Sequence, residues 1–262
     1  MAILHETLPH LAWMEPKLAR LPGIAPVNDD SWLVVDGCFA AQMAERDRLI
    51  AEVPERVHGL EPEALPAAAE LYARVMQKLA QTPGYRVGAE QVTRPDGVEV
   101  ALQPDAPLLT LGRLVQEDLC LMQRRGEEDV LTGAILCFPA SWTLAEKLGS
   151  PMARIHQPVA EYSPDLAKRV QRLFDAIRPE QPLWRMNYNV YAEADLFHPR
   201  SESDLHQVRR VGRYLRSERQ VLLRLPKTGA VVFTIHTYLV TLESLSPEAR
   251  TGLIAAGKLR GD

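Results

Sequence analysis

The sequence predicts an α+β protein, with an antiparallel sheet, flanking helices and an irregular N-terminal arm. Runs rich in β-branched and aromatic residues, typical of strands, occur at 31–36, 129–138, 184–191 and 229–240. Apolar residues recur at helical spacing at 61–84, 110–122 and 163–179. Because these two kinds of segment do not alternate regularly, an antiparallel sheet is favoured over a doubly wound parallel one.

Residues 1–30 are expected to form the arm, because prolines interrupt them at positions 9, 16, 22 and 26. Each proline removes a backbone donor and restricts the residue before it, which disfavours a helix here. Residues 31–262 then form a single domain. We expect a helix over Cys38–Ile50 after the first strand. The segments YRVG and VEVAL flank the turn-forming RPDG at 94–97 and predict a hairpin.

The second half of the chain has clearer boundaries. Thr110 can cap a helix that continues to Met122, and Ser141 can cap a short turn that ends at Gly149. The clearest helix is SPDLAKRVQRLFDAIRP at 163–179, with Ser163 as its cap and a proline in its first turn. The apolar segment DVLTGAILCF at 129–138 predicts a buried strand.

The composition is that of an ordinary globular protein. Its 262 residues are 46% hydrophobic and 24% charged, with a formal net charge of −4. No run of about 18 apolar residues occurs, which excludes a predicted membrane span. The N-terminus carries His5 and Glu6 where a secretory signal would be basic and then apolar. Three cysteines without a CxxC pair favour a reducing compartment, so we expect a cytoplasmic protein.

The chain lacks the sequence motifs of several common enzyme classes. The chain contains no G-x-G-x-x-G, no G-x-x-x-x-G-K-[ST] and no G-x-S-x-G. Dinucleotide folds, P-loop phosphate binding and hydrolase chemistry are therefore disfavoured. No cluster of His, Cys and Asp has the spacing of a zinc site. A single axial ligand to a cofactor would leave no such pattern.

Two histidines are candidates for such a ligand. His156, in ARIHQPV, lies between an apolar residue and a turn-forming Gln-Pro, so its backbone is stiff. A histidine that only forms hydrogen bonds within a loop is the alternative. His236, in TIHTY, projects from a predicted strand, where a buried histidine with satisfied hydrogen bonds is the alternative.

Segment 207–227 is strongly basic. It contains Glu218 as its one acid and the cations Arg209, Arg210, Arg213, Arg216, Arg219, Arg224 and Lys227. Nucleic-acid binding is disfavoured because the whole chain is acidic and Tyr214 is the only aromatic residue in the segment. A solvated helix face is a second interpretation. The third is a polarised pocket, in which guanidinium groups stabilise an anion and Glu218 holds an ammonium group or accepts a proton.

The strand-like segment WRMNYNVY at 184–191 carries further polar candidates. Because side chains alternate along a strand, Arg185 and Asn187 share one face. That face points either into a cofactor pocket or into solvent, and spacing alone does not decide between them.

Taken in order, the segments resemble the haem-dependent oxidative N-demethylase family, of which a dimethylamine monooxygenase is the best-known type. The similar segments are WLVVD, MAERDRL, LVQEDLCLM, ILCFPASW, EKLGSPMARIHQPV, RMNYNV and LRSERQVLLRLPKTGAVVFTIHTYL. Together they cover most of the chain from about residue 30. The chain differs from the expected pattern at Tyr188, where tryptophan is usual, and at His236, where arginine is usual.

The resemblance implies a PAS-like haem-binding domain over residues 31–262, with helical insertions. It implies a haem b enzyme, an iron-containing oxidoreductase of the monooxygenase type. Such an enzyme would use O₂ to oxidise a small secondary methylamine to a primary amine and formaldehyde. The electrons would come from NADPH through FMN and 2Fe-2S groups on separate reductase subunits, and tetrahydrofolate belongs to the wider complex. A homodimer is also expected. A non-catalytic haem-PAS sensor and an interaction subunit without haem are the alternatives.

The resemblance also implies roles for individual residues. His156 would be the metal ligand, with His236 as the alternative. Arg216, Glu218, Arg219 and Arg224 would lie on or near the distal side, where a polar pocket stabilises charge on bound O₂. We expect catalytic roles for Glu218, Arg216 and Arg224. Cofactor contacts are expected from His156, Arg185, Asn187, Arg219 and His236.

Overall fold

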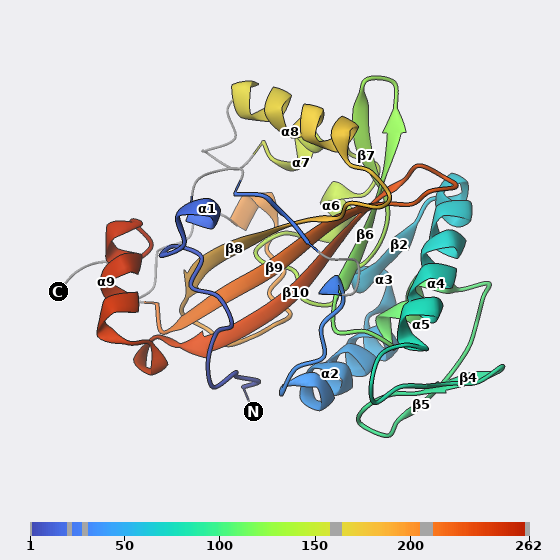
Figure 1. Cartoon of the computed structure of the whole chain (residues 1–262), viewed down its shortest axis with the longest axis horizontal. Helices are drawn as coiled ribbons and strands as arrows, with labels where there is room; N and C mark the ends of the chain where they lie inside the picture. Colours follow the sequence, from blue (N-terminus) through green and yellow to red (C-terminus); the bar gives the residue numbers. More distant parts are fainter. Residues whose placement is uncertain (1, 20–22, 28–30, 158–163, 205–211, 260–262) are drawn as a thin grey trace.

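The computed structural model describes residues 2–19, 23–27, 31–157, 164–204 and 212–259. Within these ranges, one antiparallel sheet has the strand order β1-β8-β9-β10-β6-β7-β2 (Figure 1). Its strands are β1 (Ala25–Pro26), β2 (His58–Leu60), β6 (Asp118–Arg125), β7 (Glu128–Ile135), β8 (Leu183–Tyr191), β9 (Tyr214–Arg224) and β10 (Val231–Thr241). The expected α+β class with an antiparallel sheet is confirmed.

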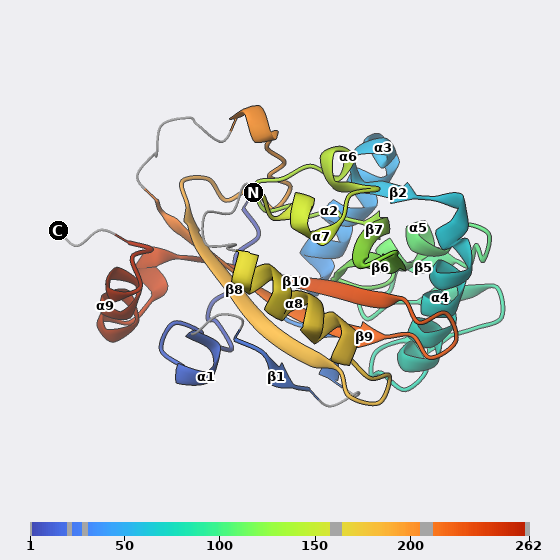
Figure 2. The ribbon, with the colours of Figure 1, turned by 90° about the horizontal axis from the view of Figure 1, so that it is seen from above.

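Helices and a smaller sheet surround the large one. The helices are α1 (Pro16–Ala19), α2 (Phe39–Glu52), α3 (Pro54–Val57), α4 (Leu65–Leu79), α5 (Pro107–Gly112), α6 (Leu144–Lys147), α7 (Met152–Ile155), α8 (Pro164–Ala176) and α9 (Pro247–Ala255). The small sheet contains β3 (Arg86–Val87), β4 (Gln91–Thr93) and β5 (Glu99–Ala101). Helix α9 lies at one end of the long strands and α4 at the other (Figures 1 and 2).

The central strands β9 and β10 of the large sheet are buried on both faces. Val221, Leu223 and Val232 belong to the core cluster that includes residues of α4 and α5. Leu222 and Ile235 alternate with them and pack with Phe174 of α8. We call these the α4 face and the α8 face. On β9 the even-numbered residues point to the α8 face and the odd-numbered residues to the α4 face.

The first residues of the chain run across the sheet. The backbone N–H of His5 donates to Leu239 O at 2.7 Å. Trp13 Nε1 donates to Ala249 O in α9 at 2.9 Å. Ala25 and Pro26 pair with β8 at the sheet edge. The arm therefore closes over strands far away in sequence, and its only regular elements among the described residues are α1 and β1.

Several predicted elements are confirmed. The helix expected over 38–50 is α2, and the helix expected over 61–84 contains α4. The helix at 163–179 is α8, although its expected cap, Ser163, lies outside the described residues. The strands expected at 129–138, 184–191 and 229–240 are β7, β8 and β10.

Other expectations were wrong. The helix predicted over 110–122 ends at Gly112 in α5, and the chain then forms strand β6 from Asp118. Asp118 accepts hydrogen bonds from the backbone N–H groups of Cys137 and Phe138, so a tertiary contact overrides the helical spacing. No strand forms at 31–36. In the expected hairpin, β5 pairs with β4, and the YRVG segment instead supplies β3 on the other side of β4.

Candidate functional site

His156 follows directly after α7 and folds back over it. Its Nδ1 atom lies 3.0 Å from Met152 O, and its backbone N–H donates to the same carbonyl at 3.1 Å. Because a carbonyl oxygen only accepts, Nδ1 must carry a proton in this contact. When the imidazole is neutral, Nε2 is then the unprotonated nitrogen. This is the tautomer with which a histidine binds a metal.

The surroundings of His156 favour the neutral ring. Burial lowers the pKa of His156, and the nearby positive charges of Arg185 and Lys147 lower it further. The hydrogen bond to Met152 O opposes these effects but does not reverse them. A ligand histidine must be neutral, so burial and these nearby positive charges favour the binding form.

Strands β8 and β9 bring four polar side chains together on the α8 face. In the register, Arg185 lies opposite Gln220 and Asn187 opposite Glu218. Glu218 Oε2 accepts from Gln220 Nε2 at 3.0 Å and lies 3.5 Å from Asn187 Nδ2. Of the predicted residues, the structure therefore unites Arg185, Asn187 and Glu218. Gln220 was not predicted, although its spacing of two from Glu218 is the signal that would have found it.

Arg185 is a partly buried cation whose Nε atom is shielded from solvent. Its Nε atom has no hydrogen-bond partner among the described residues, and the same is true of Gln220 Oε1 beside it. Burial lowers the pKa of Arg185, and the charge of Glu218 opposes that shift. A polar group that is shielded from water without a hydrogen-bond partner is costly unless a ligand completes it. The Nε–H of Arg185 is a donor that fits an anionic group, whereas Gln220 Oε1 is an acceptor and fits a donor.

Arg216 neighbours Glu218 and also donates to two backbone oxygens. Its Nε donates to Glu218 Oε1 at 3.0 Å. Its two Nη atoms donate to Leu196 O, at 2.9 Å, and to Phe138 O. Arg216 thus joins two distant loops to β9 and orients the carboxylate of Glu218.

Arg224 also lies on the α8 face, but at the end of α8. Its Nε donates to Ile177 O at 2.8 Å and its Nη2 to Phe174 O at 2.6 Å. The carbonyls at a helix C-terminus lack partners within the helix, and a cation is favourable there. The geometry gives Arg224 the role of a C-terminal cap for this helix.

Arg219 and His236 lie on the opposite, α4 face. Arg219 Nη2 donates to Ser31 O at 2.7 Å, and its guanidinium carbon is 5.5 Å from the ring centre of Trp184. His236 is fully buried. It lies beside Arg219 on the same face, because the register of β9 and β10 pairs these two residues. The structure therefore does not bring these two predicted residues together with Glu218.

His236 has a carboxylate at each ring nitrogen. Nδ1 is 3.1 Å from Glu117 Oε1, and Nε2 is 2.9 Å from Asp36 Oδ2. Asp36 also accepts from His5 Nε2 at 2.7 Å. Burial opposes a charge on His236, but the two carboxylates outweigh it and raise the pKa of His236 to about 9. Both nitrogens thus carry protons at neutral pH.

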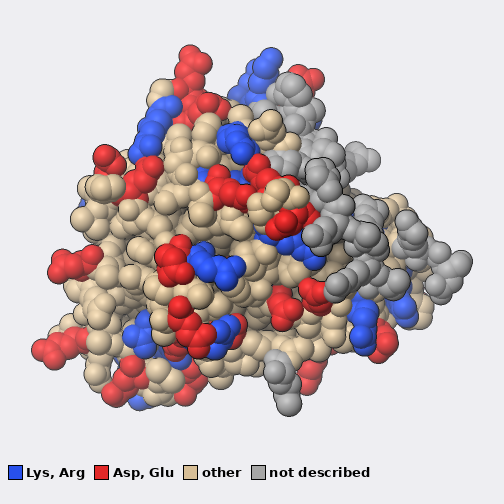
Figure 3. Space-filling view, turned by 180° about the vertical axis from the view of Figure 1, so that it is seen from behind, with Lys and Arg blue, Asp and Glu red and all other residues tan. Residues whose placement is uncertain are grey.

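The described part of the basic segment, residues 212–227, therefore has arginines on both faces of the sheet, one of them at the C-terminus of α8. Arg209 and Arg210 lie outside the described residues. On the side of the molecule shown in Figure 3, Lys and Arg side chains are interspersed with Asp and Glu. The solvated helix face is excluded over 214–224, because these residues form strand β9.

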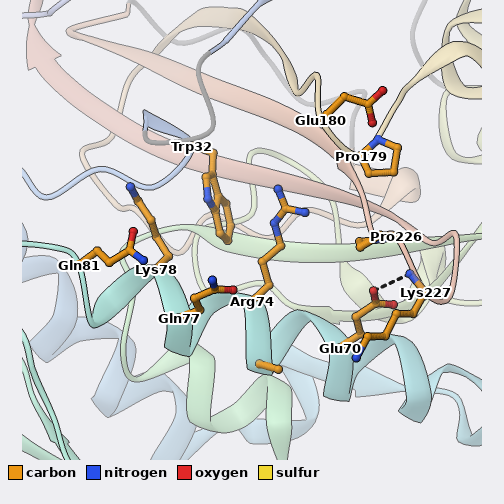
Figure 4. Close-up of a pocket in the computed structure, with 11 residues that line it drawn as sticks. Trp32, Glu70, Arg74, Gln77, Lys78, Gln81, Pro179, Glu180, Pro226 and Lys227 are labelled. Atoms are coloured by element: carbon orange, nitrogen blue, oxygen red, sulfur yellow. Dashed lines mark hydrogen bonds between the residues drawn. The ribbon is translucent and has the colours of Figure 1, made fainter.

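A separate open groove of about 500 Å³ lies between α4 and the β9–β10 turn. Figure 4 shows Arg74 and Lys78 of α4 extending towards Trp32 across the groove. Glu70 at its end accepts from the backbone N–H of Lys227 at 2.7 Å. None of the predicted site residues lines this groove.

Next to the antiparallel sheet, His156 has a carbonyl-bound Nδ1–H, and the charge of the partly buried Arg185 acts on its ring. A histidine held in this way can serve as a ligand to the metal of a cofactor. Residues 23–261 match the family described as haem-dependent oxidative N-demethylase, alpha subunit-like. The chain belongs to this family, as its sequence segments indicated.

The family assignment supports several coarser statements. The chain is similar to oxidative N-demethylases that depend on haem, and the description as an alpha subunit implies other subunits. In the described part of the chain, no helix is long and apolar enough to cross a membrane.

Proposed function

We propose that this protein holds haem b through His156 and oxidatively demethylates a small secondary methylamine such as dimethylamine. The observation that carries the proposal is the hydrogen bond from Nδ1–H of His156 to Met152 O, together with the partly buried Arg185, whose positive charge lowers the pKa of the same ring. The first favours a metal at Nε2, and the second provides a cation for a carboxylate of the cofactor.

His156 is a better candidate for the axial ligand than His236. Each nitrogen of His236 is within hydrogen-bond distance of a carboxylate oxygen, which requires two ring protons. For His236 to bind a metal, it would have to lose a proton and a buried ion pair, at a cost of several kcal/mol. His156 needs no such change, because its surroundings favour the neutral ring.

The reaction has a simple balance. One O₂, two electrons and two protons convert the secondary amine to a primary amine, formaldehyde and water. When bound, the haem would supply O₂ activation and the transfer of electrons. The electrons would come from NADPH through a separate reductase with FMN and 2Fe-2S groups, which agrees with the absence of nucleotide motifs in this sequence.

Glu218 is the residue proposed to bind the amine. Its carboxylate lies on the α8 face between Arg216 on one side and Asn187 and Gln220 on the other. A carboxylate oriented by neighbouring donors can accept a hydrogen bond from a substrate ammonium group or take its proton. Arg216 would orient Glu218, and Asn187 would add a polar amide beside the bound amine.

The remaining predicted residues have indirect roles in this proposal. Arg224 would hold the end of α8 in place against the sheet, through its bonds to Phe174 O and Ile177 O. Arg219 and His236 would stabilise the α4 face of the sheet beneath it. The proposal thus differs from the sequence-based expectation, which placed Arg219 and Arg224 at the distal side.

Two measurements on the purified protein test the proposal. After haem is added, an absorption band at roughly 400–430 nm is expected for histidine-ligated haem. The reduced protein should then form formaldehyde from dimethylamine and O₂. A band without formaldehyde would indicate a haem sensor instead of an enzyme. No band after reconstitution would contradict both, and would favour an interaction subunit that lacks haem.

A further inference from the structure

The turn that carries His156 is attached to a distant loop by three charged side chains. We call Lys147 of α6, Arg154 of α7 and Glu202 the Glu202 clamp. Arg154 Nη1 and Nη2 each donate to one oxygen of Glu202 at 2.9 Å. Lys147 Nζ donates to the same carboxylate. One carboxylate thus joins both short helices that precede His156.

Lys147 also contacts the backbone next to His156. Its Nζ donates to Ile155 O at 3.0 Å, the carbonyl of the peptide group that leads into His156. The Lys147 side chain is only 3% exposed, and that of Glu202 is 28% exposed. Because this pair is partly shielded from water, it is screened less than a surface ion pair. Arg154 and Lys147 lower the pKa of Glu202 to about 2.

A second carboxylate holds the loop that carries Glu202. Glu146 Oε1 accepts from Ser201 Oγ at 2.8 Å and lies 3.2 Å from the backbone N of Glu202. Its other oxygen accepts from Thr143 Oγ1 at 2.7 Å. The position of Glu202 is therefore set from α6 as well, so the clamp is attached at both ends.

The turn depends on such outside contacts. Helix α7 has four residues, and a helix of one turn has little stability of its own. The ring of His156 is oriented by Met152 O, a carbonyl of the same turn. Any movement of α7 would therefore move the ring with it. A metal ligand must be held in place by the groups around it to bind well.

We propose that Glu202 is a positioning residue for His156, which it holds in place through Lys147 and Arg154. This inference rests on the proposed function only in taking His156 as the haem ligand. The retention of haem by this chain is then controlled partly by a residue far along the sequence, on the loop after β8.

The experiment compares the full-length wild-type protein with Glu202→Gln, Glu202→Asp and the control Glu70→Gln. Glu70 also accepts several hydrogen bonds, from Lys227 N, Thr228 N and Thr228 Oγ1, but on α4. The readouts are the rate of haem loss to an excess of apomyoglobin, the ferric absorption spectrum, the melting temperature and the amide exchange of residues 152–156 without haem.

We expect Glu202→Gln to lose haem about tenfold faster than the wild type and to show an altered ferric spectrum. Its amides at Ile155 and His156 should exchange faster, while its melting temperature stays close to that of Glu70→Gln. Glu202→Asp, which keeps the charge, should recover part of the haem retention. An unchanged rate of haem loss and an unchanged spectrum in Glu202→Gln would overturn the inference.

The two proposals fail differently in this experiment. If the wild-type protein takes up no haem, the proposed function fails, and amide exchange in the apoprotein still tests the clamp. Faster exchange at residues 152–156 in Glu202→Gln alone supports its positioning role. Exchange equal to that of the wild type and of Glu70→Gln overturns it.

Discussion

His236 Nε2 lies 2.9 Å from Asp36 Oδ2, on a fully buried ring whose other nitrogen faces Glu117. This pair joins β10 to the segment that follows the N-terminal arm. His5 donates to the same oxygen of Asp36 and accepts from the backbone N–H of Leu239 at 3.2 Å. His5 Nε2 therefore carries its proton. The cluster is a hydrogen-bonded ion network, even though His5, Asp36 and Cys38 bring potential ligand atoms within 4.8 Å of one another.

The charge on His236 predicts a loss of stability at alkaline pH. Its pKa is raised from 6.5 to about 9 in the folded protein. Its contribution to stability is therefore complete below about pH 6.5 and decreases as the pH rises through 9. Urea unfolding from pH 6 to pH 10 measures this, as the difference between the wild type and His236→Gln. We expect that difference to shrink as the pH rises; a constant difference would mean that His236 is neutral in the fold.

The same substitution should be costly at neutral pH. His236→Gln leaves Asp36 and Glu117 close together without a cation between them. Removing one partner of a buried ion pair typically costs about 3–5 kcal/mol. The free energy of unfolding at pH 7 checks this value.

Arg46 and Asp118 predict a second large effect on stability. Both side chains are buried, and Arg46 Nη1 lies 2.6 Å from Asp118 Oδ1. Arg46 Nε also donates to Gly112 O at 2.9 Å. Arg46→Met leaves the buried carboxylate without its cation, so we expect the free energy of unfolding to fall by about 3–5 kcal/mol. Arg48→Met is the matched control on the same helix, because Arg48 pairs with Glu45 and Glu52 in solvent. It should have no measurable effect, and equal losses in the two variants would contradict the account.

Glu218 predicts an effect on substrate binding without loss of haem. Glu218→Gln keeps the shape of the side chain but removes the charge that would attract an ammonium group. A hydrogen bond to a charged group contributes about 1.5–3 kcal/mol, so the affinity for dimethylamine should fall roughly 10- to 100-fold. Spectral titration of the haem protein with the amine measures it. If Glu218→Gln has the same haem content and the same affinity for dimethylamine as the wild type, Glu218 does not bind the amine.

Local sequence patterns were enough to predict much of the fold. Helix α8 carries its start and stop signals in its own sequence, and β7 and β10 are rich in apolar and β-branched residues. The alternation of side chains along β8 also placed Arg185 and Asn187 on one face, where the register sets them opposite Gln220 and Glu218. These features depend on neighbours in sequence.

Strand β9 shows why the rest could not be predicted. Its arginines interrupt the alternation of apolar residues that would predict a strand. From sequence alone an arginine is expected at the surface, because its buried hydrogen-bond partners are not known. Arg216, Arg219 and Arg224 are accommodated by backbone oxygens of Leu196, Ser31 and Phe174, all distant in sequence. The same limit applies to β6, where Asp118 is paired only in the folded chain, and to Glu202, whose partners lie about fifty residues earlier.

The central claim is that His156 binds the haem iron, and the absorption spectrum of His156→Ala tests it most directly. The comparison uses wild-type protein, His156→Ala and His10→Ala, each reconstituted with haem under the same conditions. His10 lies on the N-terminal arm beside Trp184, with its ring half exposed, and serves as the control. The account predicts that His156→Ala loses or strongly shifts the Soret band while His10→Ala keeps it. A Soret band in His156→Ala identical to that of the wild type would contradict the claim.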